Sequence, residues 1–81
     1  MSPKKKRPSV TILTPVFNEE AGLLAYERAV SEILLSSKTY DFDVVLIDDG
    51  SRDQSWKLVR EICARDDRFR GVRLSRNYGS H

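Results

Sequence analysis

The sequence predicts an α/β fold, a Rossmann-like β-α-β-α-β arrangement within a three-layer sandwich. Three short apolar segments alternate with two segments in which apolar residues recur at helical spacing. The apolar segment at residues 42–47 does not alternate with polar residues, which indicates a strand buried on both faces, as in a parallel sheet. Right-handed crossovers would then make the three strands parallel and place helices over the sheet.

The first predicted strand covers residues 10–14, a β-branched and mostly apolar run. Pro15 should end it, because a proline cannot continue a central ladder. Asn18 is a suitable N-cap for a helix predicted from about residue 19 to 36. The apolar face of this helix consists of Leu23, Tyr26, Val30, Ile33 and Leu34.

The second strand, at residues 42–47, is followed by the acidic turn Asp48-Asp49-Gly50-Ser51. A second helix is predicted from about residue 53 to 65, and either Asp53 or Ser51 with Gln54 can cap its start. Its inward side chains are predicted to be Trp56, Val59, Ile62 and Cys63. Residues 71–75 form a short third strand, which the chain leaves through a polar turn.

The composition allows one small domain of 81 residues, with 40% hydrophobic and 32% charged residues. No run approaches the roughly 18 apolar residues of a membrane span, and the N-terminus lacks the apolar region of a signal peptide. One cysteine, Cys63, excludes an internal disulfide framework and a cysteine-based metal cluster. These features predict a cytoplasmic location.

The net charge of +2 is unevenly distributed. Four of the 14 basic residues lie at positions 4–7, whereas residues 9–81 hold 10 basic and 12 acidic residues, a net −2. We therefore expect a disordered basic leader at residues 1–8 and a domain at residues 9–81 that is not a nucleic-acid platform. The leader is either a solvated segment, a membrane-surface attachment worth about 1 kcal/mol per basic residue, or a nuclear localisation signal.

Three polar segments are expected at the carboxyl end of the sheet, where parallel α/β sheets bind ligands. They are residues 15–20, 48–53 and 75–81. Asp48 and Asp49 follow an apolar strand, where carboxylates are costly unless solvent, a donor or a cation meets them. Adjacent strand residues point to opposite faces, so one acid could bind a base while the other holds the loop. The alternative is a turn with helix-capping acids.

The other two segments supply further candidates for a nucleotide site. Phe17 could pack on a base or ribose, and Glu19 or Glu20 could accept hydrogen bonds from ribose hydroxyls; a hydrophobic staple with a helix cap is the alternative. Arg76 could bind a phosphate or be a surface charge. Asp41-Phe42-Asp43 matches the acid-any-acid pattern of metal-dependent glycosyltransferases, but it precedes its strand and is expected at the opposite end of the sheet.

Three motifs together resemble the family-two glycosyltransferases, over residues 10–81. The motifs are Thr14-Pro15-Val16-Phe17-Asn18-Glu19-Glu20, Leu46-Ile47-Asp48-Asp49-Gly50-Ser51-Arg52-Asp53 and Leu74-Ser75-Arg76-Asn77-Tyr78-Gly79. The third looks most like the branch that transfers sugars to polyprenyl phosphates, which includes dolichyl-phosphate mannosyltransferase and undecaprenyl-phosphate sugar transferases.

The resemblance implies a GT-A fold, of which this chain would be the first, nucleotide-binding part. By motif position, Pro15, Phe17 and Glu19 would line the base and ribose, Asp49 would contact the base, Asp48 would support that loop, and Arg76 would lie near the diphosphate. The donor would be a UDP-sugar in preference to a GDP-sugar, and the acceptor a polyprenyl phosphate at the cytoplasmic face of a membrane.

The family's acid-any-acid metal site and catalytic base are missing from these residues. The ligands of Mg²⁺ or Mn²⁺ would therefore lie beyond residue 81, and we expect a fragment that does not catalyse inverting transfer alone. A nicotinamide-binding domain is disfavoured because residues 15–20 contain no glycine. A receiver-like module, or another nucleotide-binding module without transferase activity, is the alternative function.

Overall fold

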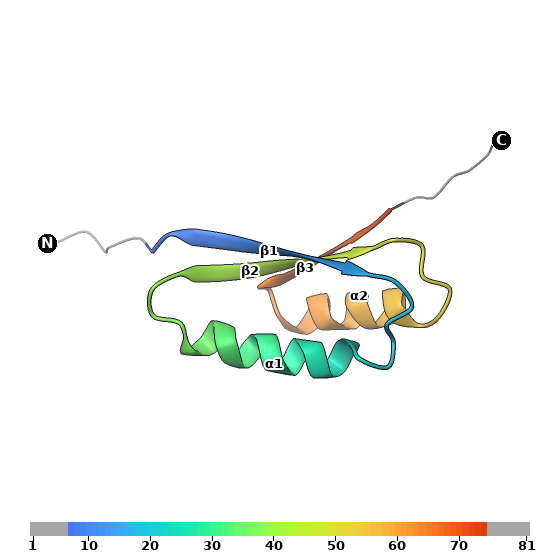
Figure 1. Ribbon diagram of the computed structural model, residues 1–81, viewed down its shortest axis with the longest axis horizontal. Coiled ribbons are helices and arrows are strands. Elements are labelled where there is room, and N and C mark those ends of the chain that lie inside the picture. The colour runs from blue at the N-terminus through green and yellow to red at the C-terminus, as the bar shows by residue number, and fades with distance from the viewer. Residues whose placement is uncertain (1–6, 75–81) are drawn as a thin grey trace, which may run out of the picture.

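The computed structural model describes residues 7–74. Its three strands are parallel and lie in the order β1-β2-β3 (Figure 1). The elements in chain order are β1 (Ser9–Val16), α1 (Leu23–Ser36), β2 (Asp41–Asp48), α2 (Ser55–Arg65) and β3 (Phe69–Arg73). The predicted α/β class and the parallel β-α-β-α-β order are confirmed.

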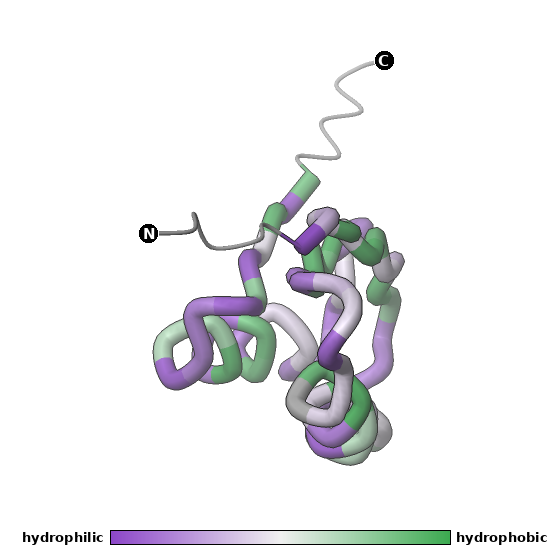
Figure 2. The backbone as a smooth tube through the Cα atoms, turned by 90° about the vertical axis from the view of Figure 1, so that its left-hand side faces the viewer, coloured by the Kyte–Doolittle hydropathy of each residue, from purple (hydrophilic) through white to green (hydrophobic). Residues whose placement is uncertain are grey.

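Both helices lie on the same face of the sheet (Figure 1). Each right-handed crossover moves the chain one strand further in the same direction, so both helices are placed on one side. Residues 7–74 therefore form two of the three predicted layers. Seen along the strands, the two helices are separate coils, each with hydrophobic and hydrophilic stretches, as expected for helices packed on one side (Figure 2).

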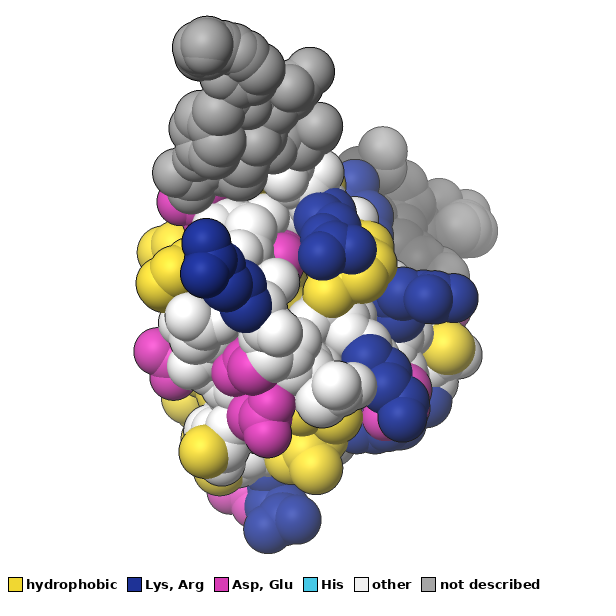
Figure 3. All heavy atoms as spheres, turned by 90° about the vertical axis from the view of Figure 1, so that its right-hand side faces the viewer, with side chains coloured by type: hydrophobic (Ala, Val, Ile, Leu, Met, Phe, Trp, Pro, Cys, Tyr) yellow, Lys and Arg dark blue, Asp and Glu magenta, His cyan; other side chains and the backbone are white. Residues whose placement is uncertain are grey.

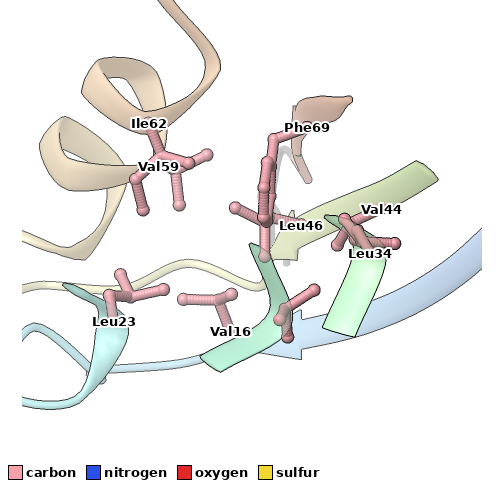
Figure 4. Close-up of a cluster of buried hydrophobic side chains, with 9 residues drawn as sticks. Val16, Leu23, Leu34, Val44, Leu46, Val59, Ile62 and Phe69 are labelled. Atoms are coloured by element: carbon pink, nitrogen blue, oxygen red, sulfur yellow. The ribbon is translucent and has the colours of Figure 1, made fainter. Parts of the chain in front are cut away.

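The core lies between the sheet and the two helices. Val44 and Leu46 of β2 point toward the helices and are fully buried, whereas Val45 and Ile47, on the other face, are only half-buried. The prediction that β2 is buried on both faces is thus wrong for residues 7–74, because none of their elements covers the second face. Figure 4 shows the cluster, which comprises Val16, Leu23, Val30, Leu34, Val44, Leu46, Val59, Ile62 and Phe69.

β1 continues through Pro15, where the sequence predicted its end. Pro15 lies opposite Ile47 in the register, and Val16 lies opposite Asp48. The Asp49 N–H donates to the Val16 carbonyl at 2.9 Å, so Val16 bonds to β2 and its neighbour Pro15 directs its nitrogen away from β2. Because β1 is an edge strand of the described sheet, the missing proline N–H removes no bond from this ladder.

α1 begins at Leu23, four residues later than predicted. The N–H groups of Gly22 and Leu23 both donate to the Glu19 carbonyl, at 3.0 and 3.1 Å, and form a turn before the helix. The N-cap position is Gly22, with no side-chain capping bond. Asn18 is therefore not the N-cap of this helix, because its side chain bonds to another loop.

The predicted apolar face of α1 is correct except for one residue. Leu23, Val30 and Leu34 are buried and Tyr26 is partly buried against the core. Ile33 is 60% exposed. At 100° per residue it lies about 80° from Leu23, at the margin of the stripe, where the sheet no longer covers it.

α2 packs closely on β3 at Gly71. A Cβ on Gly71 would come within 2.7 Å of Val59 Cγ1, so the absence of a side chain permits the contact. Phe69 is 2% exposed, and β3 begins at this core residue, two positions before the predicted start. Trp56 is partly buried against the same core. Burial raises the pKa of the neighbouring Cys63 thiol, which disfavours the thiolate and is typical of a packing residue.

Candidate functional site

Two loops lie at the carboxyl end of the sheet. The first loop, residues 17–22, joins β1 to α1, and the second loop, residues 49–54, joins β2 to α2. Because β1 and β2 are paired neighbours and end at Val16 and Asp48, which lie opposite each other, the two loops start side by side (Figure 1). Figure 3 looks onto this end, where acidic and basic side chains lie close together around a polar surface.

Asn18 joins the first loop to the second through two hydrogen bonds. Its backbone N–H donates to Ser51 Oγ at 2.8 Å, and its side-chain Oδ1 accepts from the Arg52 N–H at 2.8 Å. Asn18 has a φ of 50°, in the left-handed region that asparagine tolerates better than most residues. The local backbone thus turns so that both groups of one residue face the neighbouring loop.

Three further bonds connect the loops nearer to the helices. The Glu19 N–H donates to Ser55 Oγ at 2.7 Å, and the Glu20 N–H donates to Asp53 Oδ2 at 3.2 Å. In return, Glu20 Oε1 accepts from the Gln54 N–H at 2.8 Å. Backbone donors that a short loop leaves without partners are satisfied by side chains of the other loop.

α2 begins at Ser55, two residues later than predicted, and its N-cap is Gln54, with no side-chain capping bond, so neither predicted cap takes that position. Asp53, one residue earlier, still bonds to the start of the helix. Its Oδ1 accepts from the Ser55 N–H at 2.9 Å. Desolvation raises the pKa of this carboxyl, but hydrogen bonds from the Ser55 side chain and from backbone N–H groups of Ser55 and Glu20 outweigh it and hold the pKa below its ordinary value of 3.8. The carboxylate form is therefore the one that the two loops stabilise.

Asp48 is fully buried beneath the second loop. Its Oδ2 accepts from the Ser51 N–H at 3.2 Å and lies 3.6 Å from Arg73 Nε. The Arg73 guanidinium lies 5.6 Å from the centre of the Trp56 ring, within cation–π range. Asp48 Oδ1 is buried and accepts no hydrogen bond from the described residues. This is the placement expected of a loop support, although the role itself stays a prediction.

The structure brings five of the six predicted site residues to one end of the sheet. Pro15, Phe17 and Glu19 are exposed, Asp49 is half-buried and Asp48 is buried. Arg76 lies outside the described residues. The roles of all six in binding a nucleotide stay predictions.

A hollow of about 190 Å³ lies beside the first loop. Pro15 and Glu19 belong to its lining, whereas Phe17 and Asp49 do not. Its other lining residues are Thr14, Val16, Gly22, Leu23 and Tyr26, and Thr14 Oγ1 lies 2.6 Å from Tyr26 Oη. The predicted site residues are therefore divided between this hollow and the outer surface of the two loops.

Sequence reasoning missed the contribution of four side chains to this end of the sheet. Asn18 and Ser51 were expected to cap helices, whereas Ser55 and Arg73 were not expected to take part. Each bonds to, or lies beside, a residue at least 25 positions away in the chain. For Asn18 and Ser51 the sequence signal was a small polar residue in a loop, whereas Ser55 and Arg73 lie in α2 and β3 and gave no such signal.

Asp41 and Asp43 lie at the start of β2, at the opposite end of the sheet, as predicted. Asp43 accepts hydrogen bonds from Thr11 Oγ1 at 2.7 Å and from Arg70 Nη2 at 2.8 Å. Within residues 7–74, no three His, Cys, Asp or Glu side chains come together in a group that could hold a metal ion. The predicted position of the metal ligands beyond residue 81 stays a prediction.

Neither α1 nor α2, the helices of the described part of the chain, is long and apolar enough to cross a bilayer.

Sequence comparison gives a family and a set of relatives. The profile of "Glycosyl transferase family 2" matches residues 11–81. An undecaprenyl-phosphate 4-deoxy-4-formamido-L-arabinose transferase of Aeromonas hydrophila is 41% identical over 73 residues, which are 89% of this chain and 22% of that protein. Proteins of the same name from Pseudomonas fluorescens and Shewanella sediminis are 42% and 40% identical, over 89% of this chain and 21% and 22% of their own lengths. The chain thus spans about a fifth of the relatives it matches.

Proposed function

Because the chain belongs to glycosyl transferase family 2, we propose that it binds the nucleotide part of a nucleotide-diphosphate sugar. In the complete protein, this region would present the sugar for transfer to an acceptor. The two loops at the carboxyl end of the sheet would hold the base and ribose, with Phe17 packing against them and Asp49 accepting a hydrogen bond from the base. Arg76 would lie toward the diphosphate.

The observation that supports this proposal best is the position of the acid pair. Asp48 is buried and bonded to the backbone of the second loop, whereas the adjacent Asp49 is half-buried at the loop's surface. Gly50, with a φ of 78°, then turns the chain away directly after Asp49. One carboxylate thus bonds to the loop, and the other lies half-buried at the loop's surface, at the end of the sheet where the ligand is expected.

The names of the relatives suggest the acceptor. These proteins are undecaprenyl-phosphate sugar transferases, and we extend that acceptor class, a polyprenyl phosphate, to the complete protein at the cytoplasmic face of a membrane. A phosphate oxygen of the lipid would attack the anomeric carbon as the bond from that carbon to the nucleoside diphosphate breaks, with inversion. Bound Mg²⁺ or Mn²⁺ would neutralise the leaving diphosphate. For the donor, we favour UDP over GDP.

A nucleotide-binding module without transferase activity is the second candidate. A receiver-like role is disfavoured by the family match. The two remaining candidate functions share the nucleotide site and differ only in whether the complete protein transfers the sugar.

Nucleotide titration of the full chain tests the proposal. We expect UDP to bind, and Asp49→Ala to weaken binding about tenfold or more, as for the loss of a hydrogen bond to a charged group. Asp41→Ala is the matched control, because it removes an exposed carboxylate at the other end of the same strand. Absence of binding to both UDP and GDP, or equal affinities of the wild type and Asp49→Ala, would refute the assignment of the site.

A further inference from the structure

We propose that Asn18 is a positioning residue for nucleotide binding, fixing the first loop against the second so that Phe17 and Asp49 can contact the same base. This inference rests on the proposed function. It concerns a residue that would touch no ligand itself and would act through its neighbours.

Asn18 is attached to the second loop at two successive residues. Its backbone N–H bonds to the side chain of Ser51, and its side chain bonds to the backbone of Arg52, both at 2.8 Å. Asn18 thus donates one bond and accepts the other, and both involve the same residue of the first loop. A shift of either loop along the other would therefore break both bonds. Two such bonds at adjacent positions fix the register of the first loop against the second as well as the distance between the loops.

This attachment continues into the interior through Ser51. The Ser51 Oγ accepts from Asn18, while its own N–H donates to the buried Asp48 at 3.2 Å. Ser51 is itself 6% exposed, and its bond to Asp48 is buried, whereas its bond to the exposed Asn18 is partly buried. A hydrogen-bonded chain therefore runs from the fully buried carboxylate of β2 to the exposed first loop.

The residues that would meet the base lie next to this chain. Phe17 directly precedes Asn18, and Asp49 lies between Asp48 and the Gly50 turn. The Phe17 side chain is 54% exposed, so core packing does not fix its place. Its position is set by the backbone on both sides, which Val16 of β1 fixes before it and Asn18 fixes after it.

Asn18 adopts this arrangement instead of one that would stabilise its own helix. Asparagine is among the best N-cap residues, yet α1 starts at Leu23 and its N-cap, Gly22, has no side-chain cap bond. The left-handed φ of 50° is an additional local cost. Both features are explained if the bonds between the loops matter more for function than a helix cap does.

The experiment compares Asn18→Gly with Asn18→Asp in the full chain. Glycine accepts the positive φ but removes Oδ1, whereas aspartate keeps an oxygen acceptor for the Arg52 N–H. NMR titrations use UDP and also uridine, which carries no phosphate and so limits repulsion of the new charge in Asn18→Asp. We expect Asn18→Gly to bind about fivefold more weakly, the effect of one hydrogen bond, and Asn18→Asp to bind uridine within about twofold of the wild type.

Glu27→Ala serves as the matched control for stability. Glu27 accepts two hydrogen bonds from the Arg65 guanidinium between α1 and α2, away from both loops. Its loss should lower the melting temperature and leave the affinity unchanged. Equal affinities of Asn18→Gly and the wild type, or an equal loss of affinity in Glu27→Ala, would overturn the inference.

Amide hydrogen exchange of the Arg52 N–H, measured without nucleotide, tests the bond to Asn18 independently of binding. Together with the affinities, it separates the positioning role from the proposed function. Faster exchange in Asn18→Gly than in Asn18→Asp, together with the affinity loss, supports the positioning role. If the wild type binds nucleotide but Asn18→Gly loses none of its affinity, the positioning role is wrong and the proposed function stands. If the wild type binds neither UDP nor GDP, the proposed function is wrong and the positioning role falls with it.

Discussion

β2 carries a pair of acidic residues at each end, and the two pairs have opposite environments. At its start, Asp41 is exposed, 3.6 Å from Arg7, and Asp43 bonds to Thr11 and the exposed Arg70. At its end, Asp48 is fully buried and bonds to backbone, and Asp49 follows at the surface of a loop. Both ends have an arginine nearby, but the acids at the start of β2 are exposed or half-buried, whereas Asp48 is fully buried and bonds to the backbone of the loop.

The difference teaches that position along a parallel strand decides what a carboxylate does. The amino end of β2 receives the chain from an exposed turn, and its acids are paired with the exposed side chains of Arg7 and Arg70. The carboxyl end faces two loops whose backbone donors need acceptors. The acid-any-acid pattern at Asp41 and Asp43 matched a metal motif but was expected at the opposite end of the sheet, and the structure gives the supporting geometry to Asp48.

The contrast between the two ends of β2 would be contradicted most directly if substitutions of their acids cost the same unfolding free energy. We expect Asp48→Ala to lower the free energy of unfolding by about 2–3 kcal/mol, because it removes a hydrogen bond to a charged group and leaves the Ser51 N–H buried without a partner. Asp43→Ala should cost less than about 1 kcal/mol, since its arginine partner is exposed. Urea unfolding of both variants measures the difference, and equal costs would contradict it.

A packing change between the two ends shows whether stability and binding are separable. Gly71→Ala would place a Cβ 2.7 Å from Val59 Cγ1, and we expect a loss of about 1–2 kcal/mol of unfolding free energy as α2 and β3 adjust. Nucleotide affinity should change by less than about twofold, because neither loop contains Gly71. Thermal unfolding and UDP titration of the same samples make the test. A fall in affinity as large as that of Asp49→Ala would mean that the site responds to any packing defect.

The smallest effect concerns pH and salt. Desolvation raises the pKa of Asp53, but hydrogen bonds from Ser55 and Glu20 outweigh it and lower the pKa. At the amino end of β3, the hydrogen bond from the Arg68 side chain lowers the pKa of Asp66 and outweighs desolvation. Both folded pKa values lie below the ordinary 3.8, so both groups stabilise the fold above that pH, and this contribution is lost as the pH falls through the folded values.

Salt should separate these two carboxylates. Ions screen the Arg68–Asp66 pair but not the backbone hydrogen bonds to Asp53. In NMR titrations, 1 M salt, at which the screening length is about 3 Å, should raise the pKa of Asp66 toward its ordinary value and leave that of Asp53 nearly unchanged. A parallel shift of both would show that the two ends of the sheet are held by the same kind of interaction.

The α/β order and most core residues could be predicted from the sequence because they depend on local periodicity. Val59 and Ile62 recur at helical spacing and are fully buried. Ile33 fits the same spacing but lies beyond the width of the sheet, which periodicity does not measure. Pro15 was expected to end its strand because the rule for central strands was applied to an edge strand of the described sheet.

The position of the candidate site in the fold could be predicted from the sequence, but the contacts within it could not. The motifs placed two loops at one end of the sheet, and the structure agrees. They did not indicate that Asn18 bonds to Ser51 and Arg52, because these partners lie 33 and 34 residues away. Local rules assigned Asn18 to the nearest helix, and the tertiary structure gave its side chain to a different loop.

The distance in sequence between the bonded loops also bears on the order of folding. Bonds that close more than 30 residues are costly in chain entropy, and such non-local contacts slow the formation of native structure. The two helices can form early from local contacts, whereas the loops can meet only after β1 and β2 have aligned in parallel. We therefore expect the end of the sheet that would recognise a nucleotide to assemble late, and a nucleotide that spans both loops to bind the finished fold and draw the folding equilibrium toward it.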